Sequence, residues 1–343
     1  MFVAFAFAKT TALHGQGHEM QSNTTTLITR NCLASLARTP PELPCKYFYD
    51  ERGSRLFEQI CDQPEYYLTR TELAIMRDHS RDMATWLGDH AAVIELGSGF
   101  GRKTPLLLAA LQHPACYVPV DIAPDALAAS TRALTSRFNN LAIHPLCADY
   151  TADPLALPDA ALAATRRAIY FPGSTIGNFH PSDAATFMRR LARLAGPDGR
   201  MIVGVDQRKD RATLERAYND AAGVTAAFNL NLLHRLNRDA AARFDPAAFS
   251  HRAVFNDDAS RMEMHLVATR DTAAHMGDAT FTFAAGEHIL TECSYKHTDD
   301  TFAALADGWS IQHRWADPRG WFAVYGLSAT HDDQPIQPRT GAP

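Results

Sequence analysis

Three glycines alternate with other residues directly after an apolar run, in the stretch "VIELGSGFGRKT" at residues 93–104. Glycine lets a backbone turn sharply and approach a ligand closely. The spacing is GxGxG, whereas the fingerprint of dinucleotide-binding proteins is GxGxxG. Glu95 lies two residues before the first of these glycines, Gly97. The stretch therefore predicts a ligand-binding turn at the end of a buried strand, and its spacing disfavours a nicotinamide cofactor.

Two further acids follow the next two expected strands. Asp121 ends "CYVPVD", and Asp149 follows "LAIHPLC", next to Tyr150. A carboxylate at the first position can accept hydrogen bonds from ribose hydroxyls, and one at the second can accept from the amino group of adenine while the tyrosine ring lies against the base. Each acid alone also fits a solvated loop. Together with the glycine turn they favour a nucleoside site, in the pattern typical of S-adenosylmethionine-dependent methyltransferases.

A third polar pattern lies in "LTECSYK", residues 290–296. In an extended chain, alternation places Glu292, Ser294 and Lys296 on one face and Cys293 and Tyr295 on the other. Such a polar face points either at water or at a ligand, and the spacing alone leaves both readings open.

The elements that must position these residues alternate between strand and helix from residue 91 onward. We expect five strands, at residues 91–96, 116–121, 141–147, 166–172 and 199–206, with helices between them. The tail, residues 310–329, resembles two strands joined by a turn at 317–320. This order predicts an α/β fold, the class I (Rossmann-like) methyltransferase sheet, with helices on both faces and an antiparallel last strand.

The rest of the chain does not show this regular alternation of strand and helix. Residues 207–236 read as helical, and residues 251–296 contain three strand-like segments. We therefore expect a methyltransferase domain at 73–206 plus 297–333, and an inserted α+β substrate lobe at 24–72 plus 207–296. Residues 1–23 and 334–343 are expected to be disordered, the first as an extension or a mis-started segment, with Met20 a plausible start.

Composition excludes several classes of function. The net charge is −5 with no long basic run, which argues against nucleic acid or a membrane surface as partner. The six cysteines form no CxxC pair, and the histidines form no HExxH motif. We expect reduced thiols, no metal, and a cytoplasmic, soluble, monomeric protein.

Several stretches carry a more specific resemblance. They occur in the order "KYFYDERGSRLFEQICDQPEYYLTRTE", "ELGSGFGRKT", "FPGSTIGNFHP", "AYNDAAGVTAAFNLNLL", "RMEMHLVA" and "LTECSYK". Together they resemble the histidine Nα-methyltransferases, which make trimethylhistidine (hercynine) in ergothioneine biosynthesis. The resemblance covers nearly the whole folded chain.

The resemblance implies a site residue by residue. It implies that S-adenosyl-L-methionine contacts Tyr66, Gly97, Lys103, Asp121, Asp149 and Tyr150. It implies that L-histidine and its mono- and dimethyl intermediates contact Tyr49, Asn178, Tyr218, Met264, Glu292 and Ser294. In this family, residues matching Asn178 and Tyr218 hold the amino-acid backbone, and residues matching Glu292, Ser294 and Tyr49 contact the imidazole. Asn178, Tyr218 and Tyr49 are thus the expected catalytic residues.

The expected chemistry is an in-line displacement at a sulfonium, in which the protein mainly aligns amine, methyl and sulfur. Water or a nearby tyrosine accepts the amine proton, and the aromatic faces of Tyr49 or Tyr66 favour the growing ammonium. Two alternatives stay open: methylation of another amino acid such as tryptophan, and non-catalytic binding of the cofactor or an amino acid. The sequence departs from the family at residues 100–102, Tyr295 and His297, which flank expected contacts.

Overall fold

The computed structural model describes residues 25–330, so the predictions for residues 1–23 and 334–343 lie outside the described residues. Two compact units divide the chain. The sheet unit comprises residues 57–222, 255–262 and 293–330, and the second unit comprises residues 25–56, 223–254 and 263–292.

The sheet unit is built on a seven-stranded sheet in the order β11-β12-β5-β4-β1-β2-β3. Its strands are β1 (Ala91–Leu96), β2 (Cys116–Asp121), β3 (Leu146–Cys147), β4 (Arg166–Phe171), β5 (Arg200–Asp206), β11 (Trp309–Ala316) and β12 (Phe322–Ala329). The first five pair in parallel, whereas β12 is antiparallel to both β5 and β11. The predicted class I methyltransferase topology, including its antiparallel last strand, is confirmed.

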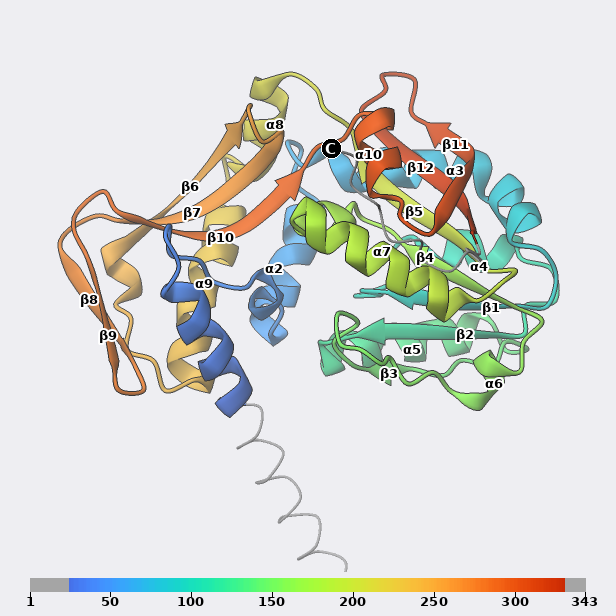
Figure 1. The fold of residues 1–343 in the computed structure, drawn as a ribbon, viewed down its shortest axis with the longest axis horizontal. Coiled ribbons are helices and arrows are strands. Elements are labelled where there is room, and N and C mark those ends of the chain that lie inside the picture. The colour runs from blue at the N-terminus through green and yellow to red at the C-terminus, as the bar shows by residue number, and fades with distance from the viewer. Residues whose placement is uncertain (1–24, 331–343) are drawn as a thin grey trace, which may run out of the picture. The chain divides into compact units, whose positions relative to one another are not determined.

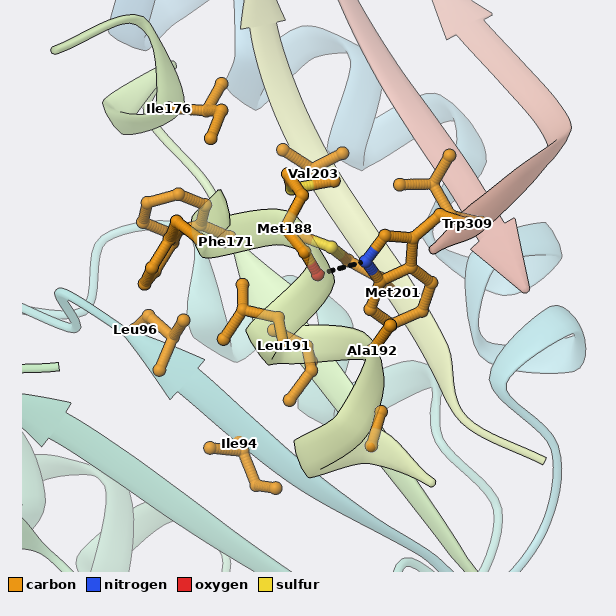
Figure 2. Packing of buried hydrophobic residues seen from close by; sticks show 14 of the residues in the cluster. Ile94, Leu96, Phe171, Ile176, Met188, Leu191, Ala192, Met201, Val203 and Trp309 are labelled. Carbon is orange, nitrogen blue, oxygen red and sulfur yellow. Dashed lines mark hydrogen bonds between the residues drawn. The ribbon is translucent and has the colours of Figure 1, made fainter. Parts of the chain in front are cut away.

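Helices cover both faces of this sheet (Figure 1). On one face α3 (Tyr67–Leu87), α4 (Thr104–Ala110) and α5 (Pro124–Arg137) bury apolar side chains, and on the other α6 (Asp159–Leu162), α7 (Pro181–Ala195) and α10 (Asp299–Leu305) do so. In the second of these cores the Trp309 indole N–H donates to the Met188 carbonyl at 2.8 Å (Figure 2). A sheet buried on both faces explains why its strands read as continuous apolar runs.

One predicted strand is much shorter than expected. Residues 141–147 were expected to be extended throughout, but β3 holds only two residues, preceded by an isolated bridge between Tyr117 and Ile143. Pro145 lies between the two pieces and has no N–H to donate to β2. The ladder is therefore interrupted at the proline.

The second unit is mainly helical with a small hairpin. Residues 25–36 are helical, followed by η1 (Cys45–Phe48) and by the start of α2 (Glu51–Cys61), and later by α9 (Val224–Asp239) and η3 (Pro246–Ala248). Strands β8 (Thr272–Met276) and β9 (Ala279–Phe283) pair antiparallel. A three-stranded sheet has the order β10-β7-β6, from β6 (Phe249–Asn256), β7 (Arg261–Ala268) and β10 (His288–Tyr295), and each of these strands contributes residues to both units.

The unit boundaries differ from the predicted domain boundaries. Residues 57–72, 207–222, 255–262 and 293–296, expected in the substrate lobe, belong to the sheet unit. The reason is packing, since α3 begins at Tyr67 and lies against β5 and β12. The expected helix at 207–236 is also two helices, α8 (Arg211–Tyr218) and α9, separated where Gly223 adopts φ +72°.

No helix among residues 25–330 is long and apolar enough to cross a membrane. All six cysteines lie in this part of the chain, and none of them forms a disulfide.

Candidate active site

The glycine turn after β1 has the geometry that its sequence predicts. Gly97, Gly99 and Gly101 adopt φ values of +70°, +48° and +69°, which side chains with a Cβ rarely adopt. A Cβ at Gly99 would meet no atom within 4 Å, so the turn leaves open space beside its backbone. The Gly99 N–H donates to Asp121 Oδ2 at 2.7 Å, which links the turn to the end of β2.

Glu95, the acid of the motif, is engaged inside the protein. Its carboxylate accepts hydrogen bonds from Thr104 Oγ1 at 2.8 and 3.0 Å and from the Tyr117 hydroxyl at 2.6 Å. Burial raises the pKa of Glu95 to about 7, although these hydrogen bonds lower it. Glu95 therefore ties β1 to the start of α4 and to β2, and holds the turn from behind.

Asp121 and Asp149 follow neighbouring parallel strands, as predicted. Asp121 accepts from the Gly99 and Ala123 N–H groups, one on each oxygen, and a carboxylate has further lone pairs for a ligand hydroxyl. Asp149 accepts from the backbone N–H of Thr151 at 2.8 Å. The ring of Tyr150 packs edge-on against that of Phe171, with 5.8 Å between the ring centroids. A Cβ added at Gly97 would lie 3.6 Å from a ring carbon of Tyr150.

Lys103 forms a buried ion pair that the sequence did not indicate. Its Nζ lies 2.5 Å from Glu72 Oε2 on α3, and the Glu72 side chain is 0% exposed. Glu72 also accepts from the Gly173 N–H at 3.0 Å, and a Cβ on Gly204 would lie 2.3 Å from its carboxylate. Lys103 thus fixes the glycine turn to α3 and to the loop after β4.

Arg102, the neighbour of Lys103, holds the turn from the solvent side. Its Nε lies 2.7 Å from Glu58 Oε2 on α2, and Nη1 lies 2.6 Å from Asp62 Oδ1. Asp62 and Glu58 raise the pKa of Arg102, and Arg102 lowers the pKa of Asp62.

We predict that Arg102→Gln weakens S-adenosylmethionine binding by roughly two- to fivefold at low salt, because exposed ion pairs stabilise only modestly. The difference should shrink in about 0.5 M NaCl, where such pairs are screened. Calorimetric titration at the two salt concentrations measures this, with Arg137→Gln, an exposed arginine at the end of α5, as control. Salt-independent weakening would contradict the ion-pair explanation.

Three predicted substrate residues belong to the sheet unit. The Tyr218 hydroxyl at the end of α8 donates to Ser294 Oγ on β10 at 2.9 Å. The ring of Tyr66, a predicted cofactor contact at the start of α3, lies edge-on to that of Tyr218 at 6.4 Å. Asn178 ends η2 (Thr175–Asn178), and within residues 25–330 no hydrogen bond of its side-chain amide is found.

The preceding residue explains how Asn178 is held. A Cβ on Gly177 would lie 2.8 Å from the Tyr295 carbonyl oxygen, so only glycine lets η2 approach the β10 backbone this closely. The "GSTIGN" stretch therefore places its asparagine beside the strand that carries Ser294.

The remaining predicted substrate residues belong to the second unit. Tyr49 follows η1, with its ring edge-on to Phe228 at 5.8 Å. Met264 is buried on β7, and its carbonyl accepts from Thr291 Oγ1 at 3.0 Å. Glu292 is half-buried on β10. Burial along β10 does not follow the predicted alternation, because from Leu290 to Tyr295 every residue is buried except the half-buried Glu292.

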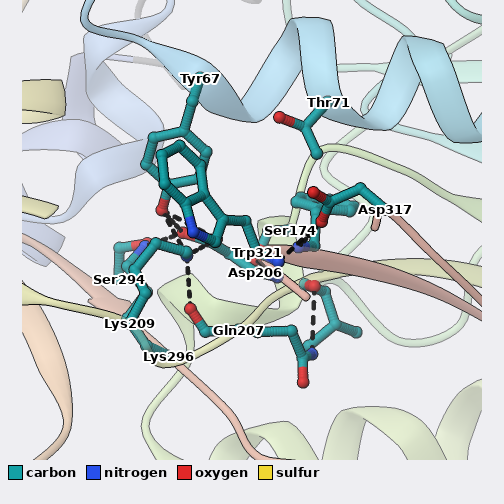
Figure 3. Close-up of polar contacts among 12 residues, drawn as sticks. Tyr67, Thr71, Ser174, Asp206, Gln207, Lys209, Ser294, Lys296, Asp317 and Trp321 are labelled. Carbon is teal, nitrogen blue, oxygen red and sulfur yellow. Dashed lines mark hydrogen bonds and ion pairs between the residues drawn. The ribbon is translucent and has the colours of Figure 1, made fainter. Parts of the chain in front are cut away.

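Sequence reasoning missed the charged groups behind Tyr218 and Ser294. Asp206, at the end of β5, lies 2.9 Å from Lys296 Nζ and 2.6 Å from Lys209 Nζ (Figure 3). The strand alternation already put Lys296 on the face of Ser294. Nothing in the spacing indicated Asp206 as its partner.

The open glycine turn, the two strand-end acids and the seven-stranded sheet define an S-adenosylmethionine-dependent methyltransferase of class I. The model of the family described as "Histidine-specific methyltransferase, SAM-dependent" matches residues 28–329. The chain belongs to this family.

Two named relatives agree with the family. The histidine N-alpha-methyltransferase of Mycolicibacterium smegmatis is 40% identical over 86% of this chain and 92% of that protein. Ergothioneine biosynthesis protein 1 of Neurospora crassa is 35% identical over 76% of this chain and 30% of that protein. A solved S-adenosylmethionine-dependent methyltransferase from Clostridium acetobutylicum aligns with a TM-score of 0.47 at 12% identity, over 80% of this chain and 98% of that one.

Proposed function

We propose that this enzyme transfers three methyl groups in succession to the α-amino group of L-histidine, giving hercynine, the first step of ergothioneine biosynthesis. The observation that carries the proposal is the match to the histidine-specific family over residues 28–329. Histidine N-alpha-methyltransferases at 38–40% identity support the same substrate and the same reacting nitrogen.

The site residues keep the roles that the resemblance implies. Bound S-adenosylmethionine supplies an electrophilic methyl group on a positively charged sulfur. Gly97, Asp121 and Asp149 hold its nucleoside part, because backbone N–H groups and carboxylates at strand ends match its polar edges. Lys103, Tyr66 and Tyr150 complete the predicted cofactor contacts. The donor itself is positively charged, so an acid-lined turn suits it.

Asn178 and Tyr218 hold the amino-acid backbone of histidine, so that the amine presents its lone pair in line with the methyl group. Ser294 contacts the imidazole, a role that also comes from the resemblance. The imidazole contacts of Glu292 and Tyr49, and the contact of Met264, rest on the resemblance. Water or a tyrosine hydroxyl accepts the proton that the amine loses before each transfer.

We predict that Asn178→Ala lowers kcat/KM for histidine by roughly 10- to 30-fold, because the amine loses a hydrogen-bonding partner. The Kd for S-adenosylmethionine should stay within about twofold, since Asn178 is assigned to the amino acid. Initial rates and calorimetry measure the two quantities. Asn140→Ala, an exposed asparagine after α5, is the control. Parallel loss of cofactor affinity would contradict the assignment.

The test of function is a substrate panel. Purified protein is incubated with S-adenosylmethionine and each of the twenty amino acids, and mass spectrometry follows one, two and three added methyl groups. Histidine is expected to gain three. Methylation of tryptophan or another amino acid but not histidine would contradict the proposal, and no methylation together with ligand binding would indicate a non-catalytic protein.

We further propose that the enzyme acts as a cytoplasmic monomer on small molecules alone, without nucleic acid or membrane partners. The net charge of −5 supports only the part of this proposal that concerns nucleic acid and membrane surfaces. Size-exclusion chromatography with light scattering tests the monomer.

A further inference from the structure

A buried cluster of charges lies directly behind two proposed substrate contacts. Asp206 is 0% exposed and accepts hydrogen bonds from the Tyr67 hydroxyl at 2.7 and 2.9 Å (Figure 3). Two ammonium groups flank the same carboxylate, Lys209 on Oδ1 at 2.6 Å and Lys296 on Oδ2 at 2.9 Å. One carboxylate thus meets two cations inside the protein.

The two lysines differ in what else they touch. Lys209 Nζ donates to the Tyr67 hydroxyl at 2.7 Å, away from the proposed substrate contacts. Lys296 Nζ donates to Ser294 Oγ at 2.7 Å and to the Tyr218 hydroxyl at 3.0 Å. The side chains of both lysines are almost wholly buried, at 4% and 0% exposed.

The hydrogen-bond polarity of this cluster follows from the ammonium. An ammonium group has three protons and no acceptor, and Lys296 directs its three at Asp206, Ser294 and Tyr218. Both hydroxyl oxygens must therefore accept. A phenol is the stronger donor of the two, so Tyr218 donates to Ser294 at 2.9 Å. Ser294 Oγ then accepts twice, and its own proton is the one left to donate elsewhere.

We propose that Lys296, anchored by Asp206, is a positioning residue that makes Ser294 an obligatory donor and so selects a ligand with an unprotonated acceptor nitrogen. This inference rests on the proposed function, in which Ser294 contacts the imidazole. A neutral imidazole offers one acceptor nitrogen, whereas an imidazolium has two N–H groups and none. The site therefore takes histidine with a neutral side chain.

The prediction concerns pH, so the charged and titratable groups near Ser294 matter: Glu292, two residues earlier on β10 and itself a proposed imidazole contact, and the buried cluster behind Ser294. Burial lowers the pKa of Lys209 to about 8, although the charge of Asp206 raises it. Burial also lowers the pKa of His297 to about 4. Burial would also lower the pKa of Lys296, but Asp206 and the Tyr218 hydroxyl hold it above its ordinary value. Burial would raise the pKa of Asp206, but the two lysines keep it below its ordinary value. The pKa of Tyr67 is raised well above its ordinary value by burial and by Asp206. Of these five groups only Lys209 begins to lose its proton near pH 7.5, and the Lys209→Met variant removes that contribution.

The experiment measures histidine binding by calorimetry to the full chain saturated with S-adenosylhomocysteine, at pH 7.5 and pH 5.5. The parent Kd should rise roughly tenfold at the lower pH, because an imidazole with an ordinary pKa near 6.5 is then mostly protonated. Lys296→Met should weaken binding roughly tenfold at pH 7.5 and reduce the pH effect to less than about threefold, since Ser294 can then turn and accept. Lys209→Met is the matched control, because it removes an ammonium from the same carboxylate without touching Ser294.

Ser294→Ala keeps the charged cluster and tests the inference even if Lys296→Met does not fold. In Ser294→Ala the Kd for histidine should also depend less on pH. Adding Lys296→Met to Ser294→Ala should change this Kd by less than about threefold. If Lys296→Met and Lys209→Met change histidine binding equally, or if Ser294→Ala keeps the parent's pH dependence, the role of Lys296 is overturned. The proposed function would not be affected by either result. A parent that neither binds nor methylates histidine would overturn the proposed function as well.

Discussion

Replacing Lys103 with methionine is expected to lower the free energy of unfolding of the sheet unit by about 3–5 kcal/mol, the usual effect of removing one partner from a buried ion pair. Glu72 is 0% exposed and cannot turn toward water. Its position is further fixed by the Gly173 N–H and by the close backbone at Gly204. The carboxylate would therefore stay buried without its cation.

The pair should respond asymmetrically. Glu72→Gln keeps an acceptor for the Gly173 N–H, and Lys103, whose side chain is 14% exposed, can reach water. The single change at Glu72 should therefore destabilise less than Lys103→Met, and the double variant should recover part of the loss because no charge remains buried.

Tryptophan fluorescence during urea unfolding measures these differences. All four tryptophans, Trp86, Trp309, Trp315 and Trp321, belong to the sheet unit, so the signal reports that unit. Equal destabilisation by the two single changes would contradict the asymmetry. Titration of the Glu72→Gln protein with S-adenosylmethionine then tests the predicted cofactor contact of Lys103, since this variant keeps the lysine.

The parts of the site that could be predicted from the sequence are those encoded locally. Gly97, Gly99 and Gly101 adopt positive φ, and the GxGxG spacing predicts a turn of this kind. Asp121 follows a strand whose apolar pattern is easy to read, and parallel strands bring such ends to one edge of a sheet. Local pattern and chain topology were sufficient here.

The parts that could not be predicted depend on pairs distant in sequence. Lys103 and Glu72 meet across α3 and the glycine turn, and Lys296 meets Asp206 across two different elements. Each residue alone has the type and spacing of a solvated charge. Only the folded chain shows that these charges are buried and paired.

The same limit applies to the unit boundaries. The sequence pattern changes after residue 206 and predicts that a new lobe begins there. Helix α8 nevertheless belongs to the sheet unit, and the boundary between the units falls at Gly223. A helix that packs on a sheet and a helix that leaves it can have the same periodicity. Tertiary packing decides between them.

The second large effect is expected for Glu95→Gln, as a change in how stability depends on pH. Burial raises the pKa of Glu95 from 4.5 to about 7. A carboxyl whose pKa is raised on folding contributes stability that is fully present below about 4.5 and is lost as the pH rises through about 7. Between pH 5 and pH 8 the parent should therefore lose about 2–3 kcal/mol through this group. A glutamine cannot ionise and would not show this loss.

The fit of the amide is favourable, because the hydroxyls of Thr104 and Tyr117 can accept hydrogen bonds as well as donate them. At pH 5 the variant and the parent should have similar unfolding free energies, and at pH 8 the variant should be more stable by about 2–3 kcal/mol. Urea unfolding at four pH values from 5 to 8 measures this difference, with Asp89→Asn, an exposed acid of the same unit, as control. A constant difference across this range would contradict the raised pKa.

The same variant also tests what the acid of the glycine motif does. Its carboxylate binds Thr104 and Tyr117 and so supports the turn from within the protein. If this support is its role, Glu95→Gln should keep the Kd for S-adenosylmethionine within about twofold, because the amide still binds both hydroxyls. A much larger loss of affinity would mean that the charge of Glu95, and with it the sulfonium or ribose of the ligand, enters the binding energy directly.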